Sequence, residues 1–146
     1  MKNALALALA ALFLSGQAAL ATEPQVERQE SMKSVGQAMG TLAKTAKGEI
    51  DYDAVAVEEA FAAMNTAAVN FIDQFPEGTE TGHETEASPN IWSDRPGFEK
   101  AVKQFDTDTA NAVAAAPQDL AAFRAEFGKV AQNCKTCHET YRVSKK

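Results

Sequence analysis

The chain has 146 residues and carries 20 acidic against 14 basic side chains, a formal net charge of −6 at pH 7. A nucleic-acid-binding protein would be expected to present a basic face, so this charge argues against a nucleic-acid partner. The length is that of one domain. Both cysteines belong to one short motif near the C-terminus, which leaves none for a structural disulfide.

The first 21 residues are typical of a secretory signal peptide. Lys2 supplies a positive charge, residues 4–14 are apolar, and Ala19-Leu20-Ala21 fits the small-residue cleavage pattern. The apolar run is short for a spanning helix, although a retained membrane anchor is the alternative. We expect residues 1–21 to be removed on export to the periplasm. Residues 22–146 would then form one mature domain of charge −7, with no stable membrane insertion.

A first helix is predicted over residues 25–46. It ends at Lys47-Gly48, where a cation in the last turn precedes a residue that tolerates the left-handed cap. Gly36 and Gly40 lower the helix propensity, and they allow close approach of either another helix or a flat cofactor. The inward-facing residues recur at intervals of three and four: Met32, Val35, Met39, Leu42 and Ala46.

A second helix is predicted to begin after Asp51 or Asp53, both good N-caps, and to end at Pro76. A long connection rich in turn formers and acids follows, and such a loop in a small bundle is usually functional or mobile. His83 lies in its polar part and is interpreted as a solvated loop residue, with a metal or iron ligand as the alternative. The apolar stripe of this helix comprises Val57, Phe61, Met64, Ala68, Phe71 or Ile72, and Phe75.

A third helix is predicted to begin at Ser93 or Asp94, with Pro96 in its first turn. Trp92, just before it, is expected to pack at the end of the bundle. A fourth helix follows Ala116-Pro117-Gln118, and its apolar stripe continues into the cysteine motif. No run has the period of a strand. Four amphipathic helices with short first and last connections predict an all-α, antiparallel up-down-up-down four-helix bundle.

The motif Cys134-Lys135-Thr136-Cys137-His138 has the C-x-x-C-H spacing for covalent attachment of haem c. Positions three apart on a helix share a face, so both sulfurs can reach the edge of one haem. His138 can place its imidazole under the iron as proximal ligand. A redox dithiol would need a βαβ surround, a zinc site would need more ligands, and a disulfide here would constrain little. Arg142 is expected near this imidazole or the haem edge, and the alternative is that it is only a favourable cation at a helix C-terminus.

A haem motif on the last of four helices resembles the class II c-type cytochromes, the cytochrome c′ family. The further matches extend over the whole mature chain: Arg28-Gln29 with Met32, Gly78-Thr79-Glu80, Pro89-x-Ile91-Trp92, and Tyr141-Arg142 after His138. The resemblance implies one covalent haem c, with Arg28 and Gln29 near it and Arg28 toward a propionate. It also implies that Thr79 and Glu80 approach the haem from the loop.

By this resemblance, Met32 occupies the distal position, opposite His138. In cytochrome c′ the distal residue does not bind the iron, which is five-coordinate and takes small gases such as nitric oxide or carbon monoxide. In similar low-spin relatives, a methionine of the first helix is the sixth ligand and the protein carries electrons. Because Met32 lies on the inward stripe, we predict that it ligates the iron; the alternative is that it packs over the haem. Met39 lies two turns further along and suits this role less well.

The sequence therefore predicts a periplasmic electron carrier that docks on redox partner proteins, with gas binding at an open distal site as the alternative. An enzyme such as a peroxidase would need a distal acid–base pair. His83 is the only other histidine, so no enzyme is predicted. The resemblance suggests a homodimer through the first two helices, while the polar outer faces allow a monomer equally well.

Overall fold

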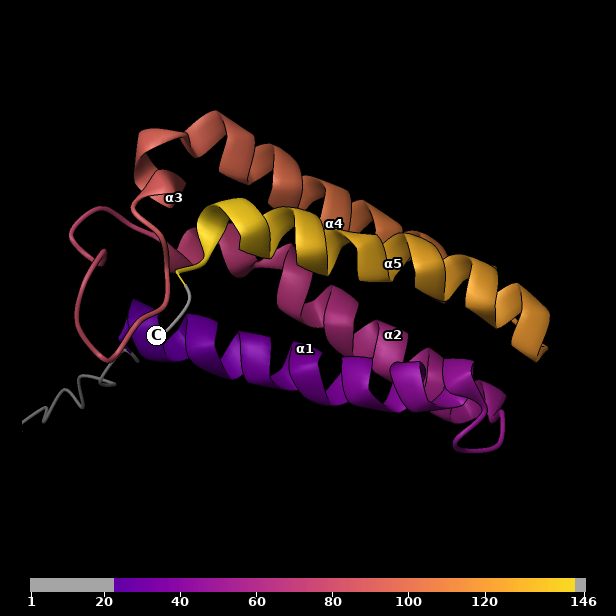
Figure 1. Cartoon of the computed structure of the whole chain (residues 1–146). Coiled ribbons are helices and arrows are strands. Elements are labelled where there is room, and N and C mark those ends of the chain that lie inside the picture. The colour runs from indigo at the N-terminus through magenta and orange to yellow at the C-terminus, as the bar shows by residue number, and fades with distance from the viewer. Residues whose placement is uncertain (1–22, 144–146) are drawn as a thin grey trace, which may run out of the picture.

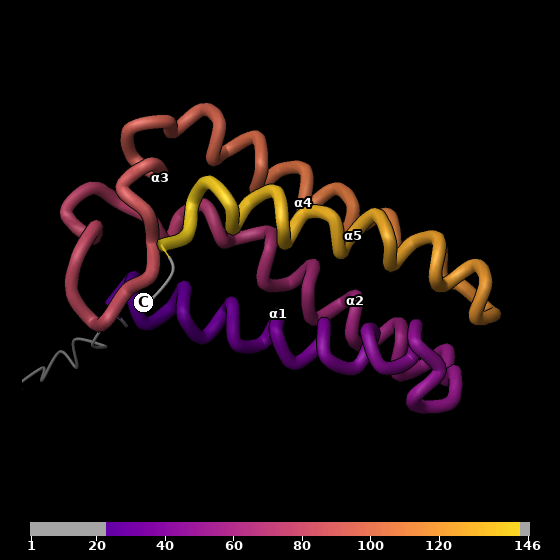
Figure 2. Tube along the Cα trace, in the orientation of Figure 1, coloured from indigo at the N-terminus to yellow at the C-terminus, as the bar shows by residue number. Residues whose placement is uncertain are grey.

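The computed structural model describes residues 23–143, and the predicted leader lies outside them. Within this range, four long helices form an antiparallel bundle (Figure 1): α1 (Pro24–Lys47), α2 (Ala54–Val69), α4 (Arg95–Ala115) and α5 (Leu120–Tyr141). Helices α1 and α4 run in one direction, and α2 and α5 in the other (Figure 2). The predicted all-α, up-down-up-down fold is confirmed. No helix in the described range is both long and apolar enough to cross a membrane.

The helix ends follow from local capping chemistry. Aspartate carboxylates accept hydrogen bonds from backbone N–H groups in the first turns of α2, α4 and α5: Asp53, Asp94 and Asp119. At the end of α1, Gly48 has a φ of 74°, and the N–H groups of Gly48 and Glu49 donate to the carbonyls of Thr45 and Lys44. This paired arrangement is a Schellman motif. The predicted end at Lys47-Gly48 and the cap at Asp53 are therefore confirmed.

The segment between α2 and α4 differs from the prediction. The second helix does not continue to Pro76: α2 ends at Val69, and a short 3₁₀ helix, η1 (Phe71–Gln74), follows Asn70. Asparagine favours turns over helix interiors, because its side chain competes for backbone hydrogen bonds. A further short helix, α3 (Asn90–Ser93), precedes α4 and carries Trp92. The Trp92 ring packs edge-on against Phe75, and its N–H donates to the Pro76 carbonyl at 3.2 Å.

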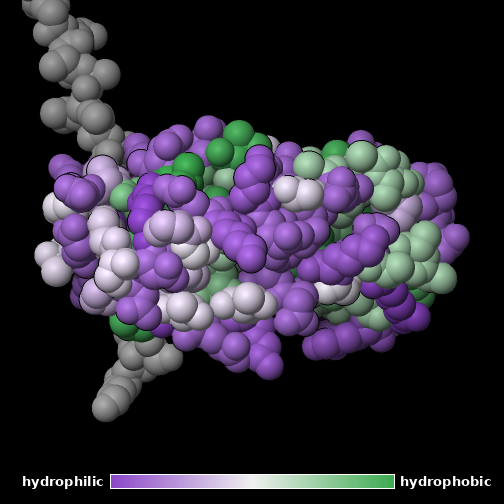
Figure 3. Space-filling model, turned by 90° about the horizontal axis from the view of Figure 1, so that it is seen from above, coloured by the Kyte–Doolittle hydropathy of each residue, from purple (hydrophilic) through white to green (hydrophobic). Residues whose placement is uncertain are grey.

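The described side chains form two buried clusters. The first fills the bundle towards the α1–α2 and α4–α5 turns and includes Leu42, Phe61 and Phe123, all fully buried. The second, here called the aromatic cluster, comprises Phe71, Phe75, Ile91, Phe98, Val102 and Tyr141. Its rings meet edge to face, with 4.8 Å between the centroids of Phe75 and Phe98. The outer face seen in Figure 3 is mainly hydrophilic, with apolar side chains in separate groups.

Residues 75–89, here called the end loop, close one end of the bundle and tie α1 to α5 (Figures 1 and 2). On the α1 side, Gln25 Nε2 donates to the Thr81 carbonyl at 2.9 Å, and Gln29 Nε2 donates to the His83 carbonyl at 2.7 Å. On the α5 side, backbone N–H groups of Ser88 and Val143 donate to the carbonyls of Tyr141 and Glu86. The end loop therefore links the two helices that carry most of the predicted site residues.

Candidate haem-binding site

Helices α1 and α5 approach each other less closely than the other neighbouring helices do, and a cavity of about 670 Å³ lies between them. This volume is in the range of small-molecule and cofactor pockets. The aromatic cluster supplies much of its apolar wall. Six of the eight residues predicted for the site converge on this cavity: Arg28, Gln29, Met32, Cys134, Cys137 and His138.

The cysteine motif lies in the last turns of α5 and faces this cavity. Cys134 and Cys137 are half-buried and not joined by a disulfide. Burial raises the pKa of the Cys134 thiol and, together with the neighbouring Cys134, raises the pKa of Cys137 to about 11. Redox dithiols react as thiolates, so neutral thiols disfavour that alternative. A zinc site needs more ligands, and residues 23–143 contain no group of three or more His, Cys, Asp or Glu side chains placed to hold a metal ion.

His138 follows the cysteines on the cavity wall, with Arg142 one turn beyond it. Partial burial lowers the pKa of His138, the positive charge of Arg142 lowers it further, and the carboxylate of Glu86 opposes both effects. The imidazole is therefore mainly neutral at pH 7 and keeps a lone pair for a metal. Of the two interpretations of Arg142, the structure supports proximity to the imidazole. Its guanidinium also donates to the Glu86 carboxylate at 2.7 Å.

Met32 and Met39 both lie on α1 and line the cavity across from α5. They differ in what they pack against. Met32 adjoins both buried clusters and shares the aromatic cluster with Cys137, whereas Met39 packs only against the first cluster. The thioether of Met32 is thus the one closer to the haem-motif end of the cavity.

Arg28 is buried, with only 4% of its surface exposed. Its Nη1 donates to the Gln74 carbonyl (3.2 Å) and to the Thr79 hydroxyl (3.1 Å). Its Nη2 donates to the Thr79 carbonyl (2.6 Å) and to the Thr85 hydroxyl (2.9 Å). The guanidinium also lies 4.9 Å from the centroid of the Phe75 ring. Arg28 is therefore the main polar anchor of the end loop on α1.

One donor of Arg28 remains unused: its Nε is buried and has no hydrogen-bond partner among the described residues. Burial lowers the pKa of Arg28, and the carboxylate of Glu80 opposes this, but a guanidinium stays charged throughout. An unpaired, charge-carrying donor on a residue that lines the cavity fits an anionic group such as a haem propionate.

Thr79 and Glu80 are not among the residues that line the cavity. Thr79 lies behind it as an acceptor for Arg28, and Glu80 Oε1 accepts from the Gly78 N–H at 3.0 Å. The part of the end loop that does line the cavity is residues 83–87. Apart from His83, which is exposed at its rim, the sequence interpretation missed these residues, and no local pattern distinguishes them from the rest of the loop.

Tyr141 ties the last turn of α5 to the start of α4. Its ring is buried in the cavity wall, and its hydroxyl donates to Asp94 Oδ2 at 2.7 Å. The same carboxylate caps α4 through the Gly97 N–H. A Cβ at Gly97 would collide with both Asp94 and the Tyr141 hydroxyl, so a side chain at position 97 would displace this hydrogen-bonded pair. The contact fixes the helical turn that carries His138.

Replacing Tyr141 with phenylalanine is expected to lower the free energy of unfolding by about 1–3 kcal/mol at pH 8, because a hydrogen bond to a charged group is lost. The bond to Asp94 raises the pKa of Tyr141 to about 12 in the folded protein. An unfolded tyrosine loses its proton near pH 10, so the stabilisation is complete below about pH 10 and is lost as the pH rises towards 12.

Urea unfolding of wild type and Tyr141→Phe at pH 8 and pH 11 tests this expectation. The difference between the two proteins should shrink at pH 11. Tyr52 is present in both and cancels from the comparison. An equal difference at both pH values would show that the hydroxyl bond to Asp94 does not stabilise the fold.

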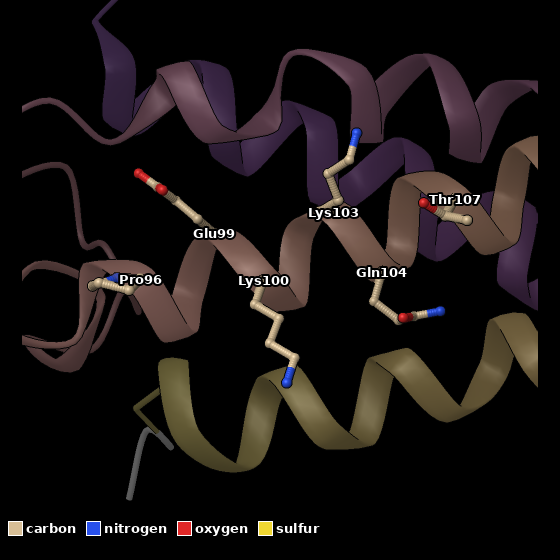
Figure 4. Close-up of a pocket in the computed structure, with 6 residues that line it drawn as sticks. All are labelled: Pro96, Glu99, Lys100, Lys103, Gln104 and Thr107. Carbon is tan, nitrogen blue, oxygen red and sulfur yellow. The ribbon is translucent and has the colours of Figure 1, made fainter.

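A second hollow, of about 410 Å³, lies on the outer face of α4 (Figure 4). It contains none of the residues predicted for the site, and its lining residues come from one helix alone: Pro96, Glu99, Lys100, Lys103, Gln104 and Thr107. Three observations assign the cofactor site to the cavity between α1 and α5 instead. These are its volume, the convergence of the cysteines and His138, and the unpaired Nε of Arg28. The residues present fit a covalently attached haem.

Comparison with known proteins agrees with this assignment. The family model for cytochrome c′ matches residues 23–142. A cytochrome c-556 of Agrobacterium tumefaciens (strain II Chrys) is 38% identical over 122 residues, which are 83% of this chain and 98% of the relative. A cytochrome c′ of Rhodopseudomonas palustris is 31% identical over 131 residues, 90% of this chain and 89% of the relative.

Solved structures give the same result. Cytochrome c′ from Rhodopseudomonas palustris superposes with a TM-score of 0.81 at 30% identity, covering 86% of this chain and 99% of its own. A ferrous variant of cytochrome c′ from Alcaligenes xylosoxidans with bound nitric oxide gives a TM-score of 0.74 at 31% identity. The match covers 84% of this chain and 94% of that one. The chain thus belongs to the cytochrome c′ family of haem-binding electron-transfer proteins, and its cofactor is covalently bound haem c.

Proposed function

We propose that the protein is a periplasmic electron carrier in which Cys134 and Cys137 would hold the haem covalently and His138 and Met32 would ligate its iron. The observation that carries this proposal is the position of Met32. It lines the cavity from α1 and packs against the same aromatic cluster as Cys137 of the haem motif. The haem, when bound, supplies the one-electron chemistry.

The residues that line the cavity have different parts in this proposal. Cys134 and Cys137 hold the cofactor to one face of α5, and His138 offers a neutral imidazole. The thioether of Met32 favours ferrous iron and so raises the reduction potential. The aromatic cluster keeps water from the apolar wall of the cavity, which also affects the potential. Arg28, which lines the cavity, would supply positive charge for a propionate.

The periplasmic location is supported by the signal-like leader and by c-type relatives in bacteria such as Agrobacterium and Rhodopseudomonas. An exported electron carrier would meet redox partner proteins there. We propose no enzymatic activity. His83, the one histidine outside the haem motif, is exposed at the rim of the cavity, and its side chain makes no hydrogen bond or ion pair with residues 23–143.

The alternative function is gas binding at a five-coordinate iron. It is favoured by solved relatives from Alcaligenes xylosoxidans that carry bound nitric oxide and bound carbon monoxide. In that case Met32 would pack beside the haem without binding the iron. The two functions differ in one property of the resting protein, namely whether the distal coordination position is filled.

Optical spectra of the purified protein, oxidised and reduced, with and without carbon monoxide, test the proposal. We expect sharp low-spin bands in the reduced form, a methionine–iron charge-transfer band in the oxidised form, and no response to carbon monoxide. A broad high-spin spectrum that shifts on adding the gas would replace electron transfer with gas binding. Absence of any haem spectrum, from a host able to mature c-type cytochromes, would contradict both functions.

A further inference from the structure

Gly36 lies in the interior of α1, one turn after Met32, and lines the cavity while remaining exposed at its mouth. Glycine lowers the stability of a helix interior relative to alanine, so its presence at position 36 needs a physical explanation. Two other glycines lie in helix interiors and are exposed, but they do not line the cavity: Gly40 in α1 and Gly128 in α5.

Close packing against another helix of residues 23–143 is not the reason. A Cβ added to Gly36 would meet no atom within 4 Å in the described part of the chain, and the same holds for Gly40 and Gly128. Of the two explanations that the sequence allowed for Gly36 and Gly40, approach of another helix is therefore not seen within the described part of this chain. Approach of a flat cofactor remains, and only Gly36 borders the cavity.

A side chain at position 36 would project towards Met32. Helical side chains tilt towards the N-terminus of their helix and cover the preceding turn, which here carries Met32. The cavity could not widen easily to accept such a side chain. One turn before Met32, Arg28 and Gln29 bond α1 to the end loop, and the end loop is bonded to α5.

We propose that Gly36 provides the space that lets the haem approach α1, and that it thereby determines whether Met32 can reach the iron. This proposal rests on the proposed ligation by Met32. Cys134 and Cys137 fix the cofactor to α5, so a larger residue at position 36 would hold it away from α1. Gly36 would then be a positioning residue that selects a filled rather than an open distal site.

The test compares the haem-loaded variants Gly36→Leu and Gly128→Leu with wild type. Both replace an exposed helical glycine by a good helix former, and only the first alters the cavity. We expect Gly36→Leu to lose the methionine–iron band and to bind carbon monoxide with an apparent affinity at least about 10-fold higher than wild type. Gly128→Leu should keep the wild-type spectrum and remain unresponsive to the gas.

Circular dichroism in the Soret region separates failure of this inference from failure of the proposed function. If wild type itself binds carbon monoxide, ligation by Met32 is wrong, but Gly36→Leu should still change the Soret signal while Gly128→Leu does not. That result would support the role of Gly36 in placing the haem. Identical Soret signals in Gly36→Leu and wild type would overturn the inference in either case.

Discussion

Replacing Met32 with alanine is expected to convert a protein that ignores carbon monoxide into one that binds it. With the thioether present, only a minor open state, about 0.1–10% of the molecules, could accept a gas. Removing the thioether makes every molecule competent, so the apparent affinity for carbon monoxide should rise by about 10- to 1,000-fold. The reduction potential should fall, because methionine ligation favours ferrous iron.

Carbon monoxide titration of the reduced protein, followed by optical spectroscopy, measures this effect. Met39→Ala is the matched control, since Met39 also lines the cavity from α1 but does not adjoin the aromatic cluster. It should leave both the spectrum and the response to the gas unchanged. An unchanged spectrum in Met32→Ala would show that Met32 does not bind the iron. A change in Met39→Ala alone would transfer the ligand assignment to Met39.

Replacing Arg28 with alanine is expected to lower the free energy of unfolding by about 3 kcal/mol or more. Arg28 is buried and donates four hydrogen bonds to residues 74–85, and bonds from charged donors are the stronger ones. Lysine should not restore the stability, because one ammonium group cannot reproduce the planar fork that reaches these acceptors. The end loop should also become sensitive to proteases, since its main anchor on α1 is gone.

Urea unfolding and limited proteolysis of Arg28→Ala, Arg28→Lys and Arg124→Ala test this prediction. Arg124 is exposed on α5 and makes a single hydrogen bond, to the Ala46 carbonyl at 2.8 Å. Replacing it with alanine should lower the free energy of unfolding by no more than about 1 kcal/mol and leave the end loop resistant to proteases. Equal losses of stability in the two alanine variants would show that the buried network of Arg28 contributes little.

The parts of this structure that the sequence predicts are those that depend on local chemistry. Asp53 and Gly48 mark helix ends because capping is complete within one turn of the chain. The cysteine motif predicts the cofactor, because the C-x-x-C-H spacing is that of haem attachment and places both sulfurs on one face of a helix. The early end of α2 at Asn70 follows from the turn preference of asparagine, which the apolar stripe of this helix conceals. The short α3 was not predicted, since the packing of its Trp92 against Phe75 joins segments distant in sequence.

The end loop shows the same limit within the site. The resemblance to cytochrome c′ implies that Thr79 and Glu80 approach the haem, whereas the part of the loop that lines the cavity is residues 83–87. His83 and Glu84 both have positive φ values, 47° and 51°, which their residue types do not predict. Their conformation accompanies long-range bonds such as that from Gln29 to the His83 carbonyl, and such bonds exist only once the bundle has formed.

The end loop also has a mechanical consequence for electron transfer. It is hydrogen-bonded to α1 one turn before Met32 and to the end of α5 one turn after His138, so it connects the two helices at the level of the site. The separation of the two proposed axial donors is then imposed by the polypeptide rather than by the oxidation state of the metal. A carrier built in this way would spend little energy on structural relaxation each time an electron arrives or leaves.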